Sequence, residues 1–493
     1  MTQPNIFLFI TDQQRWDTIH ALGATWMRTP VLDRLVAEGT TFTHCFTTSP
    51  VCVGARASLF TGSFPHMLNV YQNFDPWEPL WVGSLAEAGY HCVNIGKMHI
   101  NPYDAKGGFH QRFVVENKDR ALFLEDPRRA IYDEWDKALN ARGITKPSRY
   151  TRFTKDPEGF KQALGAFTWD LPDDLHSDNF IANTALWWLE QRKAPNPLFL
   201  QIGFCGPHPP YDPTQRYLDQ YNDVAIPVPE VTEEDMSGQT RALRELRRTM
   251  QVGNFDSIAW RPDASREDLL RLRRHYAANI TMIDEKIGEI LEVLEGRGYL
   301  ENAIVVFTSD HGDNLGDHGQ IQKQNMYEGA VRVPLIVWSP GRVPGGKIVE
   351  QLVQWMDIAP TVMEHAGVAV PTTWESRSLW PSIDDPGNPL PGRDAVYAEL
   401  GKDHVQSVVN LMIMRRDKSW KIVYYLDDSE GELYDLAGDP GERKNLWTSS
   451  EHKDIRESLI SKLLTWQVGG TFHSRIKARP TPQQPMIIKS AIG

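Results

Sequence analysis

Four short apolar segments in the first two thirds of the chain predict buried β-strands. They are apolar on both faces rather than alternating with polar residues, which is typical of strands buried in a mostly parallel sheet. Polar or charged residues follow within a few positions of the end of each segment. The four segments are residues 5–10, 91–95, 198–204 and 303–308.

Helical patterns lie between these segments, most clearly after Ser265. Apolar residues follow at three-to-four spacing from Leu269 to Leu294. Ser265 with Asp268 is typical of a capping box, and Gly296 is a stop signal. The alternation of strands and helices predicts an α/β fold, with a large, mostly parallel or mixed sheet flanked by helices. Ligands of such sheets bind where the strands end.

The pattern changes after about residue 390. Four strand-like runs are followed by a helical pattern over Glu451–Trp466 and then by a Pro-rich, unpatterned tail. They predict a smaller α+β subdomain, made of an antiparallel sheet and one helix, and an extended arm. The strand-like runs are 394–400, 405–414, 420–426 and 432–436, and the three expected parts of the chain are 1–390, 391–468 and 469–493.

Charge and composition narrow the possible partners. The 493 residues carry a net charge of −12, from 64 acidic and 52 basic residues, which opposes a general nucleic-acid or anionic-membrane surface. No run approaches the roughly 20 apolar residues of a membrane span, and the N-terminus lacks the pattern of a signal peptide. Four irregularly spaced cysteines do not form a disulfide framework. We therefore expect a cytoplasmic protein without nucleic-acid or membrane partners.

The stretch from Ser49 to Gly62 carries the most distinctive chemistry. Cys52 stands at or just before a predicted helix start, where free amides and the helix dipole stabilise an anion or a thiolate. Arg56 follows about one turn later and can point back to the same place. Taken alone, Cys52 is better explained as a buried structural cysteine beside a surface arginine.

This stretch resembles the signature of the type I sulfatases of the alkaline phosphatase superfamily. That signature is Cys-x-Pro/Ala-x-Arg followed by Thr-Gly, and Cys52, Arg56 and Thr61-Gly62 fall in register. The resemblance implies that Cys52 is oxidised to formylglycine by a separate formylglycine-generating enzyme that reads the local sequence. Gly54 departs from the signature and loosens the helix start by about 1 kcal/mol relative to Ala.

Further segments match the family's metal positions. Asp12 ends the first strand-like run, and Ser309-Asp310-His311-Gly312 ends the last one before the C-terminal part. The resemblance implies one divalent metal ion. Carboxylate oxygens suit calcium, whereas the imidazole of His311, where many members have Asn, favours manganese, so both ions stay open. The expected ligands are Asp12, Gln13, Cys52, Asp310 and His311.

The remaining motifs supply cations and proton carriers. Gly96-Lys97-Met98-His99, His208 among prolines and Lys323 are similar to the family's catalytic segments. Lys97, Lys323 and Arg56 would balance the charge of anionic ester oxygens. The two histidines titrate near neutral pH. By resemblance, His208 or Lys323 protonates the leaving oxygen, and His99 takes a proton from the residue at position 52.

The resemblance therefore implies a hydrolase acting on small sulfate esters, and three alternatives stay open. Asp12-Gln13, Asp310-His311 and Asn73, which is expected to contact substrate, are also similar to the phosphonate monoester hydrolase and choline-sulfatase-like branches. The same site would then cleave phosphonate monoesters or phosphodiesters. An unconverted protein would bind anions without turnover, and a Cys52 thiolate nucleophile ranks last. The C-terminal arm is a candidate contact between copies of the chain.

Overall fold

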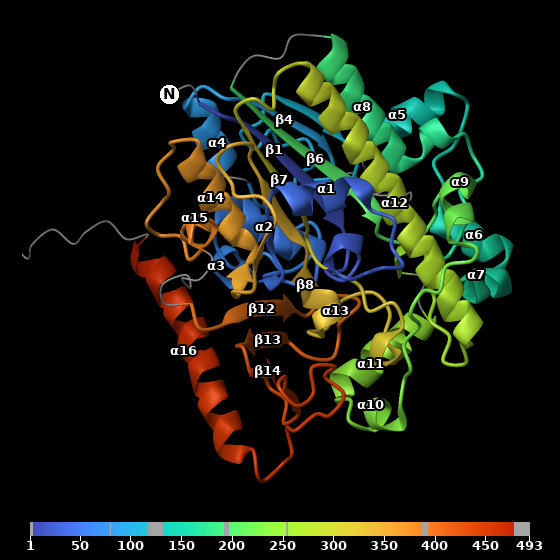
Figure 1. Ribbon diagram of the computed structural model, residues 1–493. Coiled ribbons are helices and arrows are strands. Elements are labelled where there is room, and N and C mark those ends of the chain that lie inside the picture. The colour runs from blue at the N-terminus through green and yellow to red at the C-terminus, as the bar shows by residue number, and fades with distance from the viewer. Residues whose placement is uncertain are drawn as a thin grey trace, which may run out of the picture.

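A computed structural model describes residues 3–78, 80–116, 118, 132–191, 197–252, 255–385 and 393–477. Its centre is a mixed sheet of eight strands (Figure 1). These strands are β1 (Asn5–Asp12), β2 (Thr40–Phe42), β4 (His91–Gly96), β5 (Gln111–Val114), β6 (Leu198–Pro207), β7 (Ala303–Ser309), β9 (Leu335–Trp338) and β10 (Lys347–Val349). Their order across the sheet is β10-β2-β9-β7-β1-β6-β4-β5.

The four predicted apolar segments are confirmed as β1, β4, β6 and β7. These strands are parallel neighbours in the sheet. Successive side chains of β1 point to opposite faces: Ile6 and Leu8 enter one hydrophobic cluster, Phe7 and Phe9 the other. Helices cover both faces, so neither set of side chains meets solvent (Figure 1).

Helices pack on both faces of the central sheet. On one face lie α1 (Pro30–Glu38), α8 (Ser177–Gln191) and α12 (Arg266–Gly296). On the other lie α2 (Cys52–Thr61), α4 (Leu80–Glu87) and α14 (Ile358–His365). The predicted capping box begins α12: the Ser265 hydroxyl accepts from the Asp268 amide at 3.2 Å, and the Asp268 carboxylate accepts from the Ser265 amide at 3.0 Å. The predicted long helix is therefore confirmed.

Short elements connect the layers and form the rim of the sheet. A second sheet of three strands consists of β3 (Cys45–Phe46), β8 (Arg332–Val333) and β11 (Val353–Gln354). The 3-10 helices include η4 (Phe255–Ser257) and η6 (Trp355–Asp357). The remaining α-helices of this part are α3 (Pro65–Leu68), α5 (Glu134–Ala141), α6 (Arg149–Lys155), α7 (Pro157–Ala163), α9 (Gln215–Leu218), α10 (Glu233–Ser237), α11 (Arg241–Val252), α13 (Glu328–Val331) and α15 (Trp380–Asp384).

The C-terminal subdomain has the predicted class. Four antiparallel strands, β12 (Val396–Gly401), β13 (Leu411–Arg416), β14 (Trp420–Tyr425) and β15 (Gly431–Asp435), pack against the helix α16 (Lys453–Lys477). The run expected to start a strand at 405 was placed too early, because β13 begins at Leu411. The Asp403 carboxylate accepts hydrogen bonds from the Val405 and Gln406 amides at 2.7 and 2.6 Å, which holds this segment in a turn.

The final helix is longer than predicted. It does not end at Trp466 but continues to Lys477, so residues 469–477 of the expected extended arm are helical. Trp466 stacks on Tyr397 with ring centroids 4.2 Å apart, and a side chain at Gly470 would collide with His66. This packing outweighs the low helix propensity of the Gly469-Gly470 pair.

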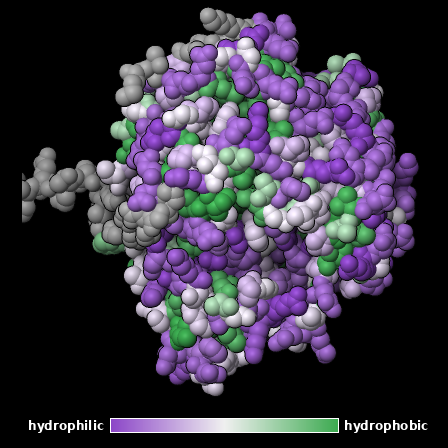
Figure 2. All heavy atoms as spheres, in the orientation of Figure 1, coloured by the Kyte–Doolittle hydropathy of each residue, from purple (hydrophilic) through white to green (hydrophobic). Residues whose placement is uncertain are grey.

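Some predictions cannot be compared with the fold. The boundary at residue 390 and residues 478–493 lie outside the described residues. Among the described helices, none is long and apolar enough to cross a membrane. Polar residues cover most of the face in Figure 2, and apolar residues form separate patches on it.

Candidate functional site

Four strand ends bring the predicted residues to one edge of the central sheet. Asp12 ends β1, Asp310 follows β7, Lys97 follows β4 and His208 follows β6. These strands are parallel and occupy adjacent positions in the sheet. A side chain at Gly96, whose φ is +92°, would meet the Gly203 carbonyl oxygen at 2.1 Å. Glycine at this position therefore allows the close turn that places Lys97 at the edge.

Cys52 begins α2 at the centre of this edge. Val51 before it is extended, with φ −143° and ψ 141°, so the helix starts at Cys52. The Sγ atom lies 3.1 Å from His311 Nε2, 3.2 Å from Lys323 Nζ and 3.6 Å from Asp12 Oδ1. The side chain is buried. The structure thus brings together Cys52 and its three predicted neighbours from distant parts of the chain.

The residues predicted as metal ligands include a compact cluster, which we call the Cys52 cluster: Asp12, Cys52, Asp310 and His311. Each offers one ligand atom, and these atoms lie within 4.8 Å of one another. His311 Nδ1 bonds the Gly312 carbonyl oxygen at 3.0 Å, which leaves Nε2 directed at the cluster. Two carboxylates and one imidazole fit a single divalent cation.

Gln13, the fifth expected ligand, makes other contacts. Its Oε1 accepts a hydrogen bond from Lys323 Nζ at 2.7 Å, and its Nε2 donates to Asp313 Oδ2 at 2.6 Å. Asp313 also accepts a hydrogen bond from Tyr211 at 2.6 Å. In this arrangement Gln13 holds Lys323 against the cluster, and its role as a metal ligand stays a prediction.

Buried cations surround the Cys52 cluster. Arg56 Nε donates to Asp310 Oδ2 at 2.8 Å, and its Nη1 donates to the Lys97 carbonyl oxygen at 2.9 Å. Lys97 Nζ lies 2.5 Å from Asp12 Oδ2. Burial alone would raise the pKa of Asp12, but Lys97 and other nearby cations hold it well below its usual range. Arg56, Lys97 and Lys323 outnumber the two carboxylates, so the site favours a bound anion.

The same cations act on the residue at position 52. Burial and Asp12 raise the pKa of the Cys52 thiol, but Lys323, Lys97 and His311 outweigh them and lower it to about 7. The surroundings therefore favour a negatively charged atom at this position.

His99 is held in the form that accepts a proton. Its backbone is left-handed, with φ +66°. Its amide donates to Glu116 Oε2 at 2.9 Å, and its carbonyl oxygen accepts from Trp77 Nε1 at 3.1 Å. Burial, together with Lys97, lowers the pKa of the ring to about 3. The ring is therefore neutral at neutral pH.

His208 lies at the rim of the site. Its ring Nδ1 bonds the Pro209 carbonyl oxygen at 2.7 Å, and its Nε2 lies 3.5 Å from Asp256 Oδ2. Asn73, by contrast, is exposed in the loop that follows α3. Its expected contact with substrate stays a prediction.

The sequence reasoning missed three acidic residues that support the site. Asp313 follows Asp310 by three positions, so the motif itself could have pointed to it. Glu116 and Asp256 carry no such signal, because their contacts with His99 and His208 join distant segments.

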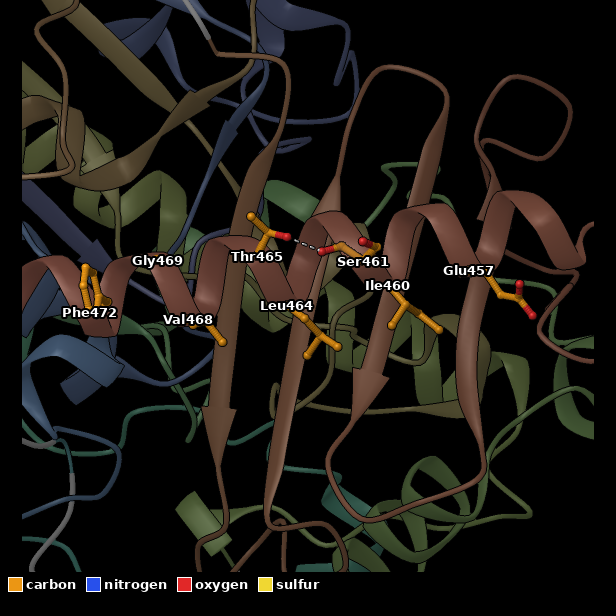
Figure 3. Close-up of a pocket in the computed structure, with 8 residues that line it drawn as sticks. All are labelled: Glu457, Ile460, Ser461, Leu464, Thr465, Val468, Gly469 and Phe472. Carbon is orange, nitrogen blue, oxygen red and sulfur yellow. Dashed lines mark hydrogen bonds between the residues drawn. The ribbon is translucent and has the colours of Figure 1, made fainter.

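A cavity of about 740 Å³ lies elsewhere, along the outer face of α16 (Figure 3). None of its lining residues belongs to the Cys52 site. The exposed side chains of Leu464, Val468 and Phe472 form an apolar row along this helix. The lining residues are Glu457, Ile460, Ser461, Leu464, Thr465, Val468, Gly469 and Phe472.

Comparison with known proteins identifies the family of the chain. The sulfatase family model matches residues 4–368, and the model described as N-sulphoglucosamine sulphohydrolase, C-terminal, matches residues 316–468. The chain is 30% identical over 484 residues to an arylsulfatase of Clostridium perfringens, covering 94% of each chain. It is 29% identical over 459 residues to a choline-sulfatase of Rhizobium meliloti, covering 90% of this chain and 82% of that protein.

A solved structure shows the same fold. The phosphonate monoester hydrolase of Agrobacterium radiobacter superposes with a TM-score of 0.78 at 24% identity, covering 95% of this chain and 96% of that one. The family match spans most of the chain and includes every residue of the Cys52 cluster. The protein therefore belongs to the sulfatase family of hydrolases.

Proposed function

We propose that this protein hydrolyses small sulfate esters, using formylglycine formed from Cys52 and one divalent metal ion. The observation that carries the proposal is the position of Cys52 in a sulfatase-family chain. Its Sγ lies at the start of α2, within 3.6 Å of ligand atoms of Asp12 and His311. The donor set of the Cys52 cluster fits the metal ion.

Two groups would complete this site. A divalent cation held by Asp12, Asp310 and His311 supplies Lewis acidity toward the ester oxygens. Formylglycine, as its hydrate, supplies one hydroxyl for attack and a second whose proton must leave before the aldehyde is restored. Conversion of Cys52 requires a formylglycine-generating enzyme as a partner.

The chain's own residues bind the ester and move its protons. Lys97 and Lys323 stabilise negative charge on the ester oxygens, most strongly where that charge grows in the transition state. Arg56 keeps the Asp310 carboxylate in place through its 2.8 Å hydrogen bond. The neutral His99 ring accepts the proton from the second hydroxyl.

A mass spectrum of the peptide that contains residue 52 tests the modification. The chain is expressed together with a formylglycine-generating enzyme, and the peptide is treated with iodoacetamide. We expect the aldehyde form and metal-dependent hydrolysis of an aryl sulfate, and we expect Cys52→Ala to abolish that hydrolysis. A fully alkylated thiol with no hydrolysis would support the anion-binding alternative instead.

A second candidate function uses the same residues on phosphonate monoesters or phosphodiesters. It is favoured by Gln13, whose amide replaces a carboxylate beside the cluster and bonds Lys323 at 2.7 Å. This substitution lowers the negative charge that faces the substrate. The ratio of kcat/KM for an aryl sulfate and for a phenyl phosphonate separates the two functions, and elemental analysis of the active protein distinguishes calcium from manganese.

A further inference from the structure

We propose that Asp256 is a positioning residue that holds His208 as the acid for the leaving group. The inference rests on the proposed function and deepens it, because it chooses between His208 and Lys323 for that role. Asp256 lies on η4, far from His208 in the sequence. Its Oδ2 lies 3.5 Å from His208 Nε2, and its Oδ1 lies 3.4 Å from Arg149 Nη1.

The hydrogen bonds of His208 fit a ring that carries both protons. A carbonyl oxygen only accepts, so Nδ1 must donate to Pro209 across their 2.7 Å contact. If the ring were neutral, the lone pair of Nε2 would face the Asp256 carboxylate. The protonated ring instead donates from Nδ1 to the carbonyl oxygen and presents the Nε2 proton toward Asp256.

The backbone of η4 aims Asp256 at His208. Asp256 has φ +53° and ψ 36°, and Ser257 has φ +64°. Two consecutive non-glycine residues in the left-handed region are unusual, and such conformations persist only where the surrounding structure enforces them. Here the turn directs a carboxylate into the rim of the site, where the His208 side chain is 12% exposed.

The charges around Asp256 keep it ionised. Burial alone would raise its pKa, but His208, Lys323 and Arg149 hold that pKa well below its usual range. Two further titratable groups face it: Asp403 from the turn before β13, and Tyr211. Asp256 therefore presents a carboxylate to the Nε2 side of the His208 ring.

Lys323 has a different orientation. Its Nζ donates to Cys52 Sγ at 3.2 Å and to Gln13 Oε1 at 2.7 Å. These contacts place Lys323 beside residue 52, which carries the nucleophile in the proposed function. We therefore assign the role of leaving-group acid to His208 rather than to Lys323.

The proton balance of this step is simple. When the bond between sulfur and the ester oxygen breaks, its electron pair moves to the alcohol oxygen. That oxygen takes the Nε2 proton of His208, which leaves its 3.5 Å contact with Asp256 Oδ2. The ring becomes neutral and keeps Nδ1–H on the Pro209 carbonyl oxygen. Asp256 stays deprotonated, and the ring regains its proton from water.

A series of leaving groups tests the proposal. Poor leaving groups need an acid, whereas a nitrophenolate leaves without one. Asp256→Asn should lower kcat/KM about 100-fold for phenyl sulfate but change it less than about threefold for nitrophenyl sulfate. Asp263→Asn removes an exposed carboxylate, with 78% of its side chain accessible, and should leave both values unchanged. Asp256→Glu keeps the charge and should restore part of the loss.

A double-mutant cycle shows whether Asp256 acts through His208. His208→Ala should reproduce the leaving-group dependence, and adding Asp256→Asn should then cost nothing more. An equal loss for both substrates, or a further loss in the His208→Ala background, would overturn the inference while leaving the proposed function intact. A converted wild-type protein that hydrolyses neither ester would overturn the proposed function and the inference together. Thermal unfolding of each variant identifies losses that come from misfolding.

Discussion

Two buried clusters near the ends of the central strands each combine two aspartates with a histidine, but their charged groups are arranged differently. The first is the Cys52 cluster. The second, the Lys118 cluster, consists of Lys118, His176, Asp178 and Asp212. Lys118 Nζ lies 2.8 Å from Asp212 Oδ1 and donates to the Pro210 carbonyl oxygen at 3.2 Å. His176 Nε2 lies 3.3 Å from the same Asp212 oxygen.

The groups of the Lys118 cluster pair with each other and with the backbone. Asp178 Oδ1 accepts from the Cys205 and Gly206 amides at 2.8 and 2.9 Å. The cluster therefore fixes the loop that carries His208. In the Cys52 cluster, ligand atoms converge instead on one point and cations are in excess. Convergence and charge imbalance, rather than residue type, mark a site that binds something.

Asp310→Asn should break the Cys52 cluster and have the largest effect. It removes a ligand charge while keeping the side-chain shape, so we expect metal loss and a fall in kcat/KM of about 1,000-fold, the upper end for removing one electrostatic group. Elemental analysis and aryl sulfate kinetics measure the two effects. An unchanged metal content would show that Asp310 is not a ligand.

Lys118→Met should disrupt the Lys118 cluster and lower the stability of the protein, with little effect on its activity. Asp212 and Asp178 would lose their buried cation, which lowers the free energy of unfolding by about 3–5 kcal/mol. The kcat/KM of the folded fraction should change less than about tenfold. Urea unfolding measures the loss. Lys137→Met removes a lysine whose side chain is 63% exposed and should cost less than about 1 kcal/mol. Equal losses in the two variants would mean that the Lys118 cluster is not stabilising.

Low pH should also reduce the stability that the Lys118 cluster contributes, but by less than the Lys118→Met substitution does. Burial alone would raise the pKa of Asp212, but Lys118 and His176 hold it below its usual range. A carboxyl group with a depressed pKa contributes stability above its unfolded value of about 4, and this contribution is lost as pH falls further. Asp212→Asn should therefore be less stable than the wild type at neutral pH, and the difference should shrink below about pH 4. Unfolding curves at several pH values measure it, and a constant difference would contradict the assigned cause.

The predicted parts of the fold are those encoded by neighbouring residues. The strands ending at Asp12 and Ser309 could be predicted from their apolar runs, and the start of α12 from the spacing of Ser265 and Asp268. The proximity of Cys52 and Arg56 could likewise be predicted, because the two residues are about one helical turn apart in the sequence. Each of these signals lies within a few positions of the residue it concerns.

The missed features depend on contacts between distant segments. Asp256 reaches His208 only through a left-handed turn, and Lys118 meets Asp212 only after β6 and its loop have folded. The extra turns of α16 follow the stacking of Trp466 on Tyr397 and include the close approach of Gly470 to His66. No local pattern carries this information, because the free energy comes from packing and charge in the folded chain.

The burial of α2 sets a time limit on any modification of Cys52. Every residue from Cys52 to Thr61 is buried, and η6 and α14, about 300 positions later in the chain, pack against this helix. At about 5–20 residues per second of synthesis, roughly 15–60 s separate the appearance of Cys52 from that of its cover. An enzyme that oxidises this thiol has to reach it before η6 and α14 have packed over α2. The yield of active protein would then depend on the race between modification and folding as well as on the chemistry of the finished site.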